Sequence, residues 1–252
     1  MIEAISTSAT GLNASQALLD VTGNNLANIN TTAFAANQVS FQDLFSAAIA
    51  GPSAAGSLQL GRGVLVSATN KTFAQGPLQN TGGPLDVAIE GNGFFQVTQA
   101  DGAAAYTRDG SFQVDAGGRL VTAAGLPVQP AIVVPPGATS ISIATDGTVT
   151  ATIAGSPRTV GQLTLIRFPN PPGLTSLGGN LYAASAASGN PTTAVPGQGG
   201  TGTLVQGFLE GSNVNPTTEL VNLLIAQQTF AANSQAIVAA NQMLIDTVGL
   251  VS

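Results

Sequence analysis

Residues 215–251 read NPTTELVNLLIAQQTFAANSQAIVAANQMLIDTVGLV, a stretch that predicts one long helix. It opens with Pro216, which is favoured in a first turn, with hydroxyls at Thr217 and Thr218 that can cap, and with Glu219 near the positive end of the helix dipole. One row of apolar side chains then recurs every seven residues: Leu223, Phe230, Ile237, Leu244 and Val251. This spacing, 3.5 residues per turn, is typical of the packing seam of a coiled coil.

Two neighbouring rows qualify this seam. The row Leu224, Ala231, Val238 and Ile245 is apolar and widens the stripe to about 100°. The row Gln227, Ser234 and Asn241 is polar. We therefore expect a seam that is partly wet or that meets polar partners.

The opposite end of the chain repeats the pattern. A second row at seven-residue spacing consists of Ile5, Leu12, Leu19 and Leu26, and no proline occurs before Pro52. Asparagines crowd residues 24–30, which favours an end of this helix near residue 30. Residues 1–50 and residues 205–252 each carry three acids and no base, so the two ends are alike in charge. We predict that residues 1–36 and 214–252 form one helical coiled-coil domain. Its subunit-packing seam would consist of two rows of side chains: Ile5, Leu12, Leu19 and Leu26 at one end of the chain, and Leu223, Phe230, Ile237 and Leu244 at the other.

The middle of the chain is rich in short strand-like runs separated by turn dipeptides such as Asp109-Gly110 and Asp146-Gly147. The predicted strands are 85–89, 93–97, 111–114, 119–122, 131–134, 140–143, 148–153 and 162–168. We expect an extended connector over 37–75 and a β-rich domain over 76–213. The predicted fold class is α+β, with terminal helices and a central domain of short antiparallel strands.

The composition excludes several classes of function. Without Cys or His there is no thiolate nucleophile, no histidine base and no zinc site of the usual kind. Six basic residues cannot form a basic groove for nucleic acid. We expect no catalytic residue, no cofactor and no metal.

Two motifs need an alternative reading. Residues 197–202 fit G-x-G-x-x-G, but they lie in a low-complexity stretch rather than between a strand and a helix, as a dinucleotide site requires. Asp86 and Glu90 are the best carboxylate pair for a glycosidase, yet four residues along a strand separate them by roughly 13 Å. We interpret both as structural, and Gly91-Asn92-Gly93 as a turn.

Several stretches resemble the axial proteins of the bacterial flagellum. Residues 24–34, NNLANINTTAF, are similar to the N-terminal signature of rod and hook proteins, and residues 212–244 are similar to their C-terminal signature. Residues 86–97, 105–115 and 119–122 look like the rod–hook β domain. Val160–Leu163 and Gly179–Tyr182 look most like the distal-rod branch of this family.

The resemblance implies a structural subunit of the distal rod. Such a subunit polymerises into a helical tube that transmits torque from motor to hook and conducts exported subunits. The implied partners are copies of itself, proximal rod proteins, hook protein and the surrounding peptidoglycan and outer-membrane ring proteins. The implied location is the periplasmic span of the basal body, reached by export without a cleavable signal peptide.

Four alternatives stay open at this point. A proximal rod protein or a hook-type axial protein would share both terminal signatures, although 252 residues leave no room for the large outer domain of hook proteins. A cell-wall hydrolase or a β-rich binding module would belong to a different class. A hydrolase needs a convergent pair of acids in a cleft, and the sequence offers no such pair.

Overall fold

The computed structural model describes residues 2–44, 48–49, 58–59 and 61–249 and contains two compact units. The helical unit comprises Met1–Ala27, Asn37–Lys71 and Asn215–Ser252, and the β unit comprises Asn28–Ala36 and Thr72–Val214. The predicted ranges 1–36 with 214–252, 37–75 and 76–213 stay predictions. In this grouping, the strands of the expected connector belong with the helices, and the segment after the first helix belongs with the β unit.

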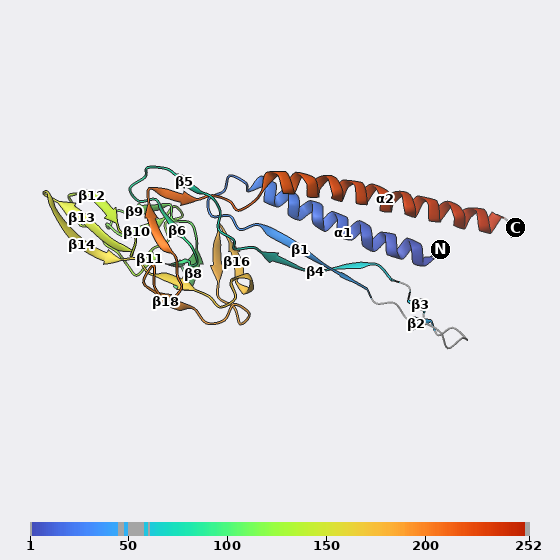
Figure 1. The fold of residues 1–252 in the computed structure, drawn as a ribbon, viewed down its shortest axis with the longest axis horizontal. Coiled ribbons are helices and arrows are strands. Elements are labelled where there is room, and N and C mark those ends of the chain that lie inside the picture. Colours follow the sequence, from blue (N-terminus) through green and yellow to red (C-terminus); the bar gives the residue numbers. More distant parts are fainter. Residues whose placement is uncertain (1, 45–47, 50–57, 60, 250–252) are drawn as a thin grey trace. The chain divides into compact units, whose positions relative to one another are not determined.

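The helical unit is built on two helices, α1 (Ile2–Ala27) and α2 (Pro216–Gly249), which lie side by side and antiparallel (Figure 1). Both predicted helices are confirmed. The first ends inside the asparagine cluster, as expected, and the second is capped by Asn215 rather than by the threonines. The Asn215 side-chain oxygen accepts hydrogen bonds from the backbone N–H groups of Thr217 and Thr218.

A β-ribbon completes the helical unit. The antiparallel strands β1 (Asn37–Asp43) and β4 (Val64–Lys71) pair with a register shift between Ser40 and Phe41, and β2 (Ala48–Ile49) pairs with β3 (Leu58–Gln59). The ribbon packs on α1. At this contact the N–H of Val64 donates to Thr10 Oγ1 at 3.2 Å. Gly63 has φ +113°, and a Cβ there would lie 2.1 Å from the same oxygen, so only glycine fits.

The β unit consists of short antiparallel strands. Five of them form one sheet in the order β11-β7-β8-β17-β16, and three form a second in the order β12-β13-β14. The remaining strands pair as β10-β9, β15-β18, β19-β6 and β20-β5. The bounds are β5 (Leu78–Asn80), β6 (Val87–Glu90), β7 (Phe95–Thr98), β8 (Ala104–Thr107), β9 (Phe112–Val114), β10 (Leu120–Thr122), β11 (Val128–Gln129), β12 (Ala138–Ile143), β13 (Thr148–Ile153), β14 (Ser156–Gln162), β15 (Leu165–Arg167), β16 (Thr175–Gly178), β17 (Leu181–Ala183), β18 (Thr192–Ala194), β19 (Thr203–Gln206) and β20 (Phe208–Glu210), with a short 3₁₀ turn at Pro171–Gly173.

Large apolar side chains fill the interior of this unit. One cluster gathers apolar residues from ten strands and the loops between them around Ile89 and Phe95, both fully buried. A second cluster is aromatic: Phe73, Phe94, Tyr106, Phe168 and Tyr182 meet edge to face. Burial raises the pKa of Tyr182 to about 12.

Most predicted strands are found, and the differences have local causes. The predicted strand 131–134 is wrong: only an isolated bridge joins Val133 to Arg119. Pro130 and Pro135 flank this stretch, and proline cannot donate to a strand ladder. The predicted strand 162–168 overlaps the end of β14 and all of β15. The alanine-rich strand β8 was not predicted, because alanine has little strand preference.

Candidate subunit-packing surface

The two helices of the helical unit meet through small and polar residues. Ser15 Oγ donates to Thr229 Oγ1 at 3.1 Å, and both lie in the middle of the contact. One turn earlier on α1, Gly11 faces Asn233 so closely that a Cβ on the glycine would lie 2.6 Å from the amide nitrogen. Ala226 and Ala240 are the buried residues of α2. The contact within the chain therefore includes small and polar residues.

Asn25 is the polar centre of this contact. Its side chain is 1% exposed. The amide nitrogen donates to the backbone oxygen of Asn37 at 2.8 Å and to Glu219 Oε1 at 3.0 Å, and the amide oxygen accepts from the N–H of Asn37 at 2.9 Å. One buried side chain thus joins the end of α1, the first residue of β1 and the first turn of α2.

The predicted seam residues lie beside this polar contact. On α1 the row Ile5, Leu12, Leu19 and Leu26 is half-buried, and so are Leu223, Ile237 and Leu244 on α2. Phe230, the fourth member on α2, is 41% exposed. Their role in packing against other subunits stays a prediction.

The neighbouring row on α2 is apolar and exposed. Leu224 is 56% exposed, Val238 66% and Ile245 65%. Together with Leu220 and Ala231 they form what we call the outer face of α2. At 100° per residue, these five side chains fall within one narrow stripe of the helix. A continuous apolar stripe that its own chain leaves uncovered is typical of an interaction surface.

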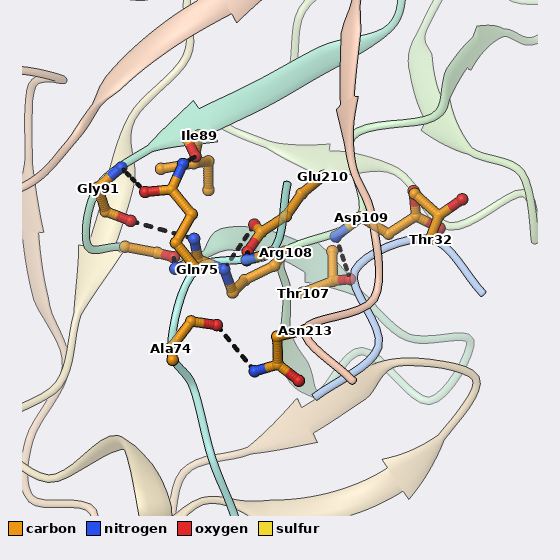
Figure 2. Close-up of polar contacts among 12 residues, drawn as sticks. Thr32, Ala74, Gln75, Ile89, Gly91, Thr107, Arg108, Asp109, Glu210 and Asn213 are labelled. Carbon is orange, nitrogen blue, oxygen red and sulfur yellow. Dashed lines mark hydrogen bonds and ion pairs between the residues drawn. The ribbon is translucent and has the colours of Figure 1, made fainter. Parts of the chain in front are cut away.

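The β unit contains a different polar centre, a buried ion pair (Figure 2). Arg108 Nε donates to Glu210 Oε2 at 2.8 Å, and the side chains are 6% and 4% exposed. The guanidinium also donates to the carbonyls of Gly91 and Gly93, and Glu210 Oε1 accepts from the N–H of Gly76. Every charged atom is engaged inside the protein, which indicates a structural role.

Nearby contacts gather further segments around the same pair. Gln75 Nε2 donates to the carbonyl of Ile89 and its Oε1 accepts from Gly91 N–H, while Asn213 Nδ2 donates to the carbonyls of Thr72 and Ala74 (Figure 2). The segment 28–36 joins through the N–H of Ala33, which donates to the carbonyl of Glu210. The pair therefore sits where three separate stretches of the β unit meet.

The residues considered for chemistry all lie in the β unit. Asp86 accepts a hydrogen bond from Thr81 Oγ1, and Glu90 is exposed at the end of β6. Residues 197–202 form a loop before β19, and Gly91-Asn92-Gly93 joins β6 to β7. Among the described residues, no three His, Cys, Asp or Glu side chains lie close enough together to hold a metal ion.

None of the helices in the described part of the chain has the length and hydropathy needed to span a membrane.

Sequence reasoning missed both polar centres. It treated Asn25 as part of a helix-ending cluster and Glu210 as one of the acids of the C-terminal end. A single buried asparagine among heptad rows is a known device for fixing register, and that signal was available for Asn25. Arg108 and Glu210 are 102 residues apart, and nothing local in the sequence connects them.

Comparison with known proteins places these features in a family. Three family models match: "Flagella basal body rod protein" over residues 5–34, "Flagellar hook protein FlgE/F/G D1 domain" over 88–151, and "Flagellar basal body rod FlgEFG protein C-terminal" over 205–250. The first and third cover most of α1 and α2, and the second covers part of the β unit.

Relatives that match over nearly their full length belong to the same family. The chain is 46% identical to flagellar basal-body rod protein FlgG of Buchnera aphidicola subsp. Schizaphis graminum, over 97% of this chain and 98% of the relative. It is 40% identical to FlgG of Bacillus subtilis over 99% of both chains. Similarity to FlgF of Caulobacter vibrioides is lower, at 35% over 84% of this chain and 82% of the relative. The predicted resemblance to the rod–hook family and its distal-rod branch is confirmed, and the chain belongs to the FlgG family of flagellar basal-body rod proteins.

Proposed function

We propose that this chain is a structural subunit of the flagellar distal rod, and that it polymerises into a helical tube through the outer face of α2. The observation that carries the proposal is that α2 leaves a row of large aliphatic side chains exposed. Covering such a stripe with another apolar surface is favourable, because it removes apolar area from water.

The covering surface belongs to other copies in this proposal. The outer face of α2 differs in residues from the half-buried row Ile5, Leu12, Leu19 and Leu26 on α1. A contact between two different surfaces of identical subunits repeats head to tail, and it produces a helical array when the rotation between subunits does not close a ring. The half-buried row Leu223, Phe230, Ile237 and Leu244 would then lie at the edge of the same contact.

The finer parts of the function rest on family membership. The tube would transmit torque from motor to hook and conduct exported subunits. Its neighbours would be proximal rod proteins, hook protein and the ring proteins of peptidoglycan and outer membrane, with no nucleic acid. The subunit would act in the periplasmic span after export without a cleavable signal peptide, and it would not be an enzyme.

Charge substitution on the outer face tests this proposal. Leu224→Asp and Val238→Asp should abolish tubes in electron micrographs of concentrated protein, because each buries an unpaired carboxylate in the polymer contact. Ala236→Asp is the matched control: Ala236 is exposed on the same helix, about 160° around from Val238. Unchanged helical circular dichroism would verify the fold of each variant. Tubes from Leu224→Asp and Val238→Asp as abundant as those from the unsubstituted protein would refute the proposal.

A further inference from the structure

We infer that the polar contacts between α1 and α2 determine register and partner: Asn25, with Ser15 and Gly11, selects the α2 of the same chain and fixes its alignment. The outer face of α2 is thereby left for other copies. Only this last consequence rests on the proposed polymer, since the register is a property of the single chain.

The three contacts describe one register. From Gly11 to Ser15 is four residues along α1, and from Asn233 to Thr229 is four residues back along α2. From Ser15 to Asn25 is ten residues, and from Thr229 to Glu219 is again ten. The number of residues between contacts is the same on both helices and runs in opposite directions. The two helices therefore pair antiparallel, with one constant register from Gly11 to Asn25. Polar side chains at intervals along the contact therefore all point to the same alignment.

Leucine rows alone would not fix this alignment. Their members recur every seven residues, so a shift by one heptad places apolar side chains against apolar side chains again. The polar contacts are not repeated at every heptad: Leu18 lies between Gly11 and Asn25 on α1. Glu219 lies in the first turn of α2, so after a shift of one heptad in either direction Asn25 loses it as an acceptor. The loss of this buried hydrogen bond to a charged group penalises the shifted state.

The close approach of the two helices at Gly11 is a second feature that favours this register over a shifted one. A Cβ at this position would meet three atoms of the Asn233 side chain within 2.9 Å, so the two helices touch where the side chain is absent. In the same register Leu18 lies opposite Ala226, which is fully buried. Close packing of this kind requires small residues on specific turns of each helix. After a shift of one heptad, Leu18 would face the larger Asn233 or Glu219 in place of Ala226, whereas Gly11 would face an alanine.

Asn25 also ties the register to the ribbon. Both backbone groups of Asn37 are engaged by the Asn25 amide, which orients that amide so that its nitrogen reaches Glu219. The donor to α2 is thus positioned by the start of β1 as well as by α1. In a polymer, where other copies supply similar helices, this three-way contact distinguishes the helix of the same chain.

Engineered cysteines read the register directly, because the chain contains no native cysteine. Ser15 Oγ and Thr229 Oγ1 are 3.1 Å apart, so Ser15→Cys with Thr229→Cys should form a disulfide on mild oxidation of the monomer. Ser15→Cys with Asn222→Cys, and Ser15→Cys with Ala236→Cys, report a shift of one heptad in either direction. In the otherwise unsubstituted chain we expect the first pair to crosslink at least tenfold faster than either shifted pair.

Asn25→Asp then tests the assignment. It replaces the donating amide by a carboxylate facing Glu219, so the 15–229 crosslink should slow several-fold while a shifted pair accelerates. Adding Glu219→Gln supplies a donor from the other side and should restore the 15–229 crosslink. The matched control is Asn13→Asp, exposed on the same helix. Crosslinking unchanged in Asn25→Asp, or an equal fall in all three pairs, would overturn the inference.

A mixing experiment separates this inference from the proposed polymer. Chains carrying only Ser15→Cys are assembled with chains carrying only Thr229→Cys. We expect few mixed dimers, because each α1 keeps its own α2. Abundant mixed dimers would overturn partner selection. A failure to form any tube would count against the proposed polymer and leave the monomer crosslinks as the test of register.

Discussion

The β unit and the helical unit treat their large apolar side chains in opposite ways. Val87, Ile89 and Phe95 of the β unit are 0% exposed, whereas Leu224, Val238 and Ile245 of α2 are more than half exposed. Burying one such side chain contributes about 1.5–3 kcal/mol, so the β unit obtains this stabilisation within one chain. In the proposed polymer, the helical unit would gain it on association. Under that proposal, the β unit folds alone and the helical unit serves assembly.

The polar interactions follow the same division. In the β unit a charged pair is enclosed and fully hydrogen-bonded, and it connects stretches that are far apart in sequence. In the helical unit, one contact between the helices joins two hydroxyls, and another joins the neutral Asn25 amide to the Glu219 carboxylate. Neutral groups cost less to bury than charges, but they select a partner by the placement of donors and acceptors. We infer that the first device serves stability and the second serves alignment.

Breaking the buried ion pair should have the largest effect, and in the β unit alone. Arg108→Met leaves the Glu210 carboxylate buried without its cation, which we expect to lower the free energy of unfolding of the β unit by about 3–5 kcal/mol. Tyrosine fluorescence during urea denaturation measures this unit separately, since both tyrosines of the chain, Tyr106 and Tyr182, lie in it. Helical circular dichroism should follow the other unit.

A second ion pair of equal length provides the control. Arg119 Nε and Asp115 Oδ2 are also 2.8 Å apart, but the Arg119 side chain is 58% exposed. Arg119→Met should therefore cost far less stability than Arg108→Met. Replacing both members of the buried pair, with Arg108→Met and Glu210→Leu, should cost less than Arg108→Met alone, because no charge is stranded. Equal losses for Arg108→Met and Arg119→Met would contradict this account of the β unit.

Alkaline pH should also distinguish the two units. Burial raises the pKa of Tyr182 from its ordinary value of 10.0 to about 12, so the folded state binds this proton more tightly than the unfolded chain. The associated stability is complete below pH 10 and is lost as the pH rises toward 12, by on the order of 2–3 kcal/mol. The helical unit contains no tyrosine and should lack this contribution.

Tyr182→Phe isolates the alkaline effect. Urea midpoints of the β unit, measured between pH 9 and 12, should fall less steeply in this variant. Burial also raises the pKa of Tyr106, so a smaller dependence on pH should remain. A midpoint that falls equally steeply in both proteins would assign the alkaline loss to other groups.

The sequence predicts the elements of this fold better than their contacts. Heptad spacing is enough to find α1 and α2, and strand-like runs between turns find most strands of the β unit, because both signals are local. The pairing of the helices is different. Leu223 and Leu224 are equally apolar neighbours, yet one is half-buried and the other is 56% exposed. The choice between their rows is made by Gly11, Ser15 and Asn25 on the facing helix, which no pattern within α2 reveals.

The candidate surface shows the same limit. The sequence points to one row on each helix for subunit packing. In the structure these rows are mostly half-buried beside the polar contact, and the neighbouring row of α2 carries the exposed face. Arg108 and Glu210 were found only from the fold, because tertiary structure alone brings them together. Long-range pairs of this kind leave no spacing or periodicity to detect.

The smallest expected effect concerns the N-terminus of α2 and acts on the helical unit alone. Asn215 Oδ1 accepts from the N–H groups of Thr217 at 3.0 Å and Thr218 at 3.2 Å, which satisfies two of the four amides that a helix leaves unpaired at its start. Asn215→Ala should lower the stability of the helical unit by about 1 kcal/mol, and Asn215→Asp should retain most of it, because a carboxylate accepts the same bonds and favours the positive end of the dipole. The readout is the thermal midpoint of the helical circular dichroism signal, with tyrosine fluorescence unchanged. Asn215 precedes Glu219 by one turn, and its hydrogen bonds to Thr217 and Thr218 lie within one helix, so they do not fix the register. Asn215→Ala should therefore slow the crosslink between Ser15→Cys and Thr229→Cys only slightly, whereas Asn25→Asp should accelerate a shifted pair instead. A loss of tyrosine fluorescence signal at the same temperature in Asn215→Ala would mean that the two units unfold together, and the contrast between them would then not extend to stability.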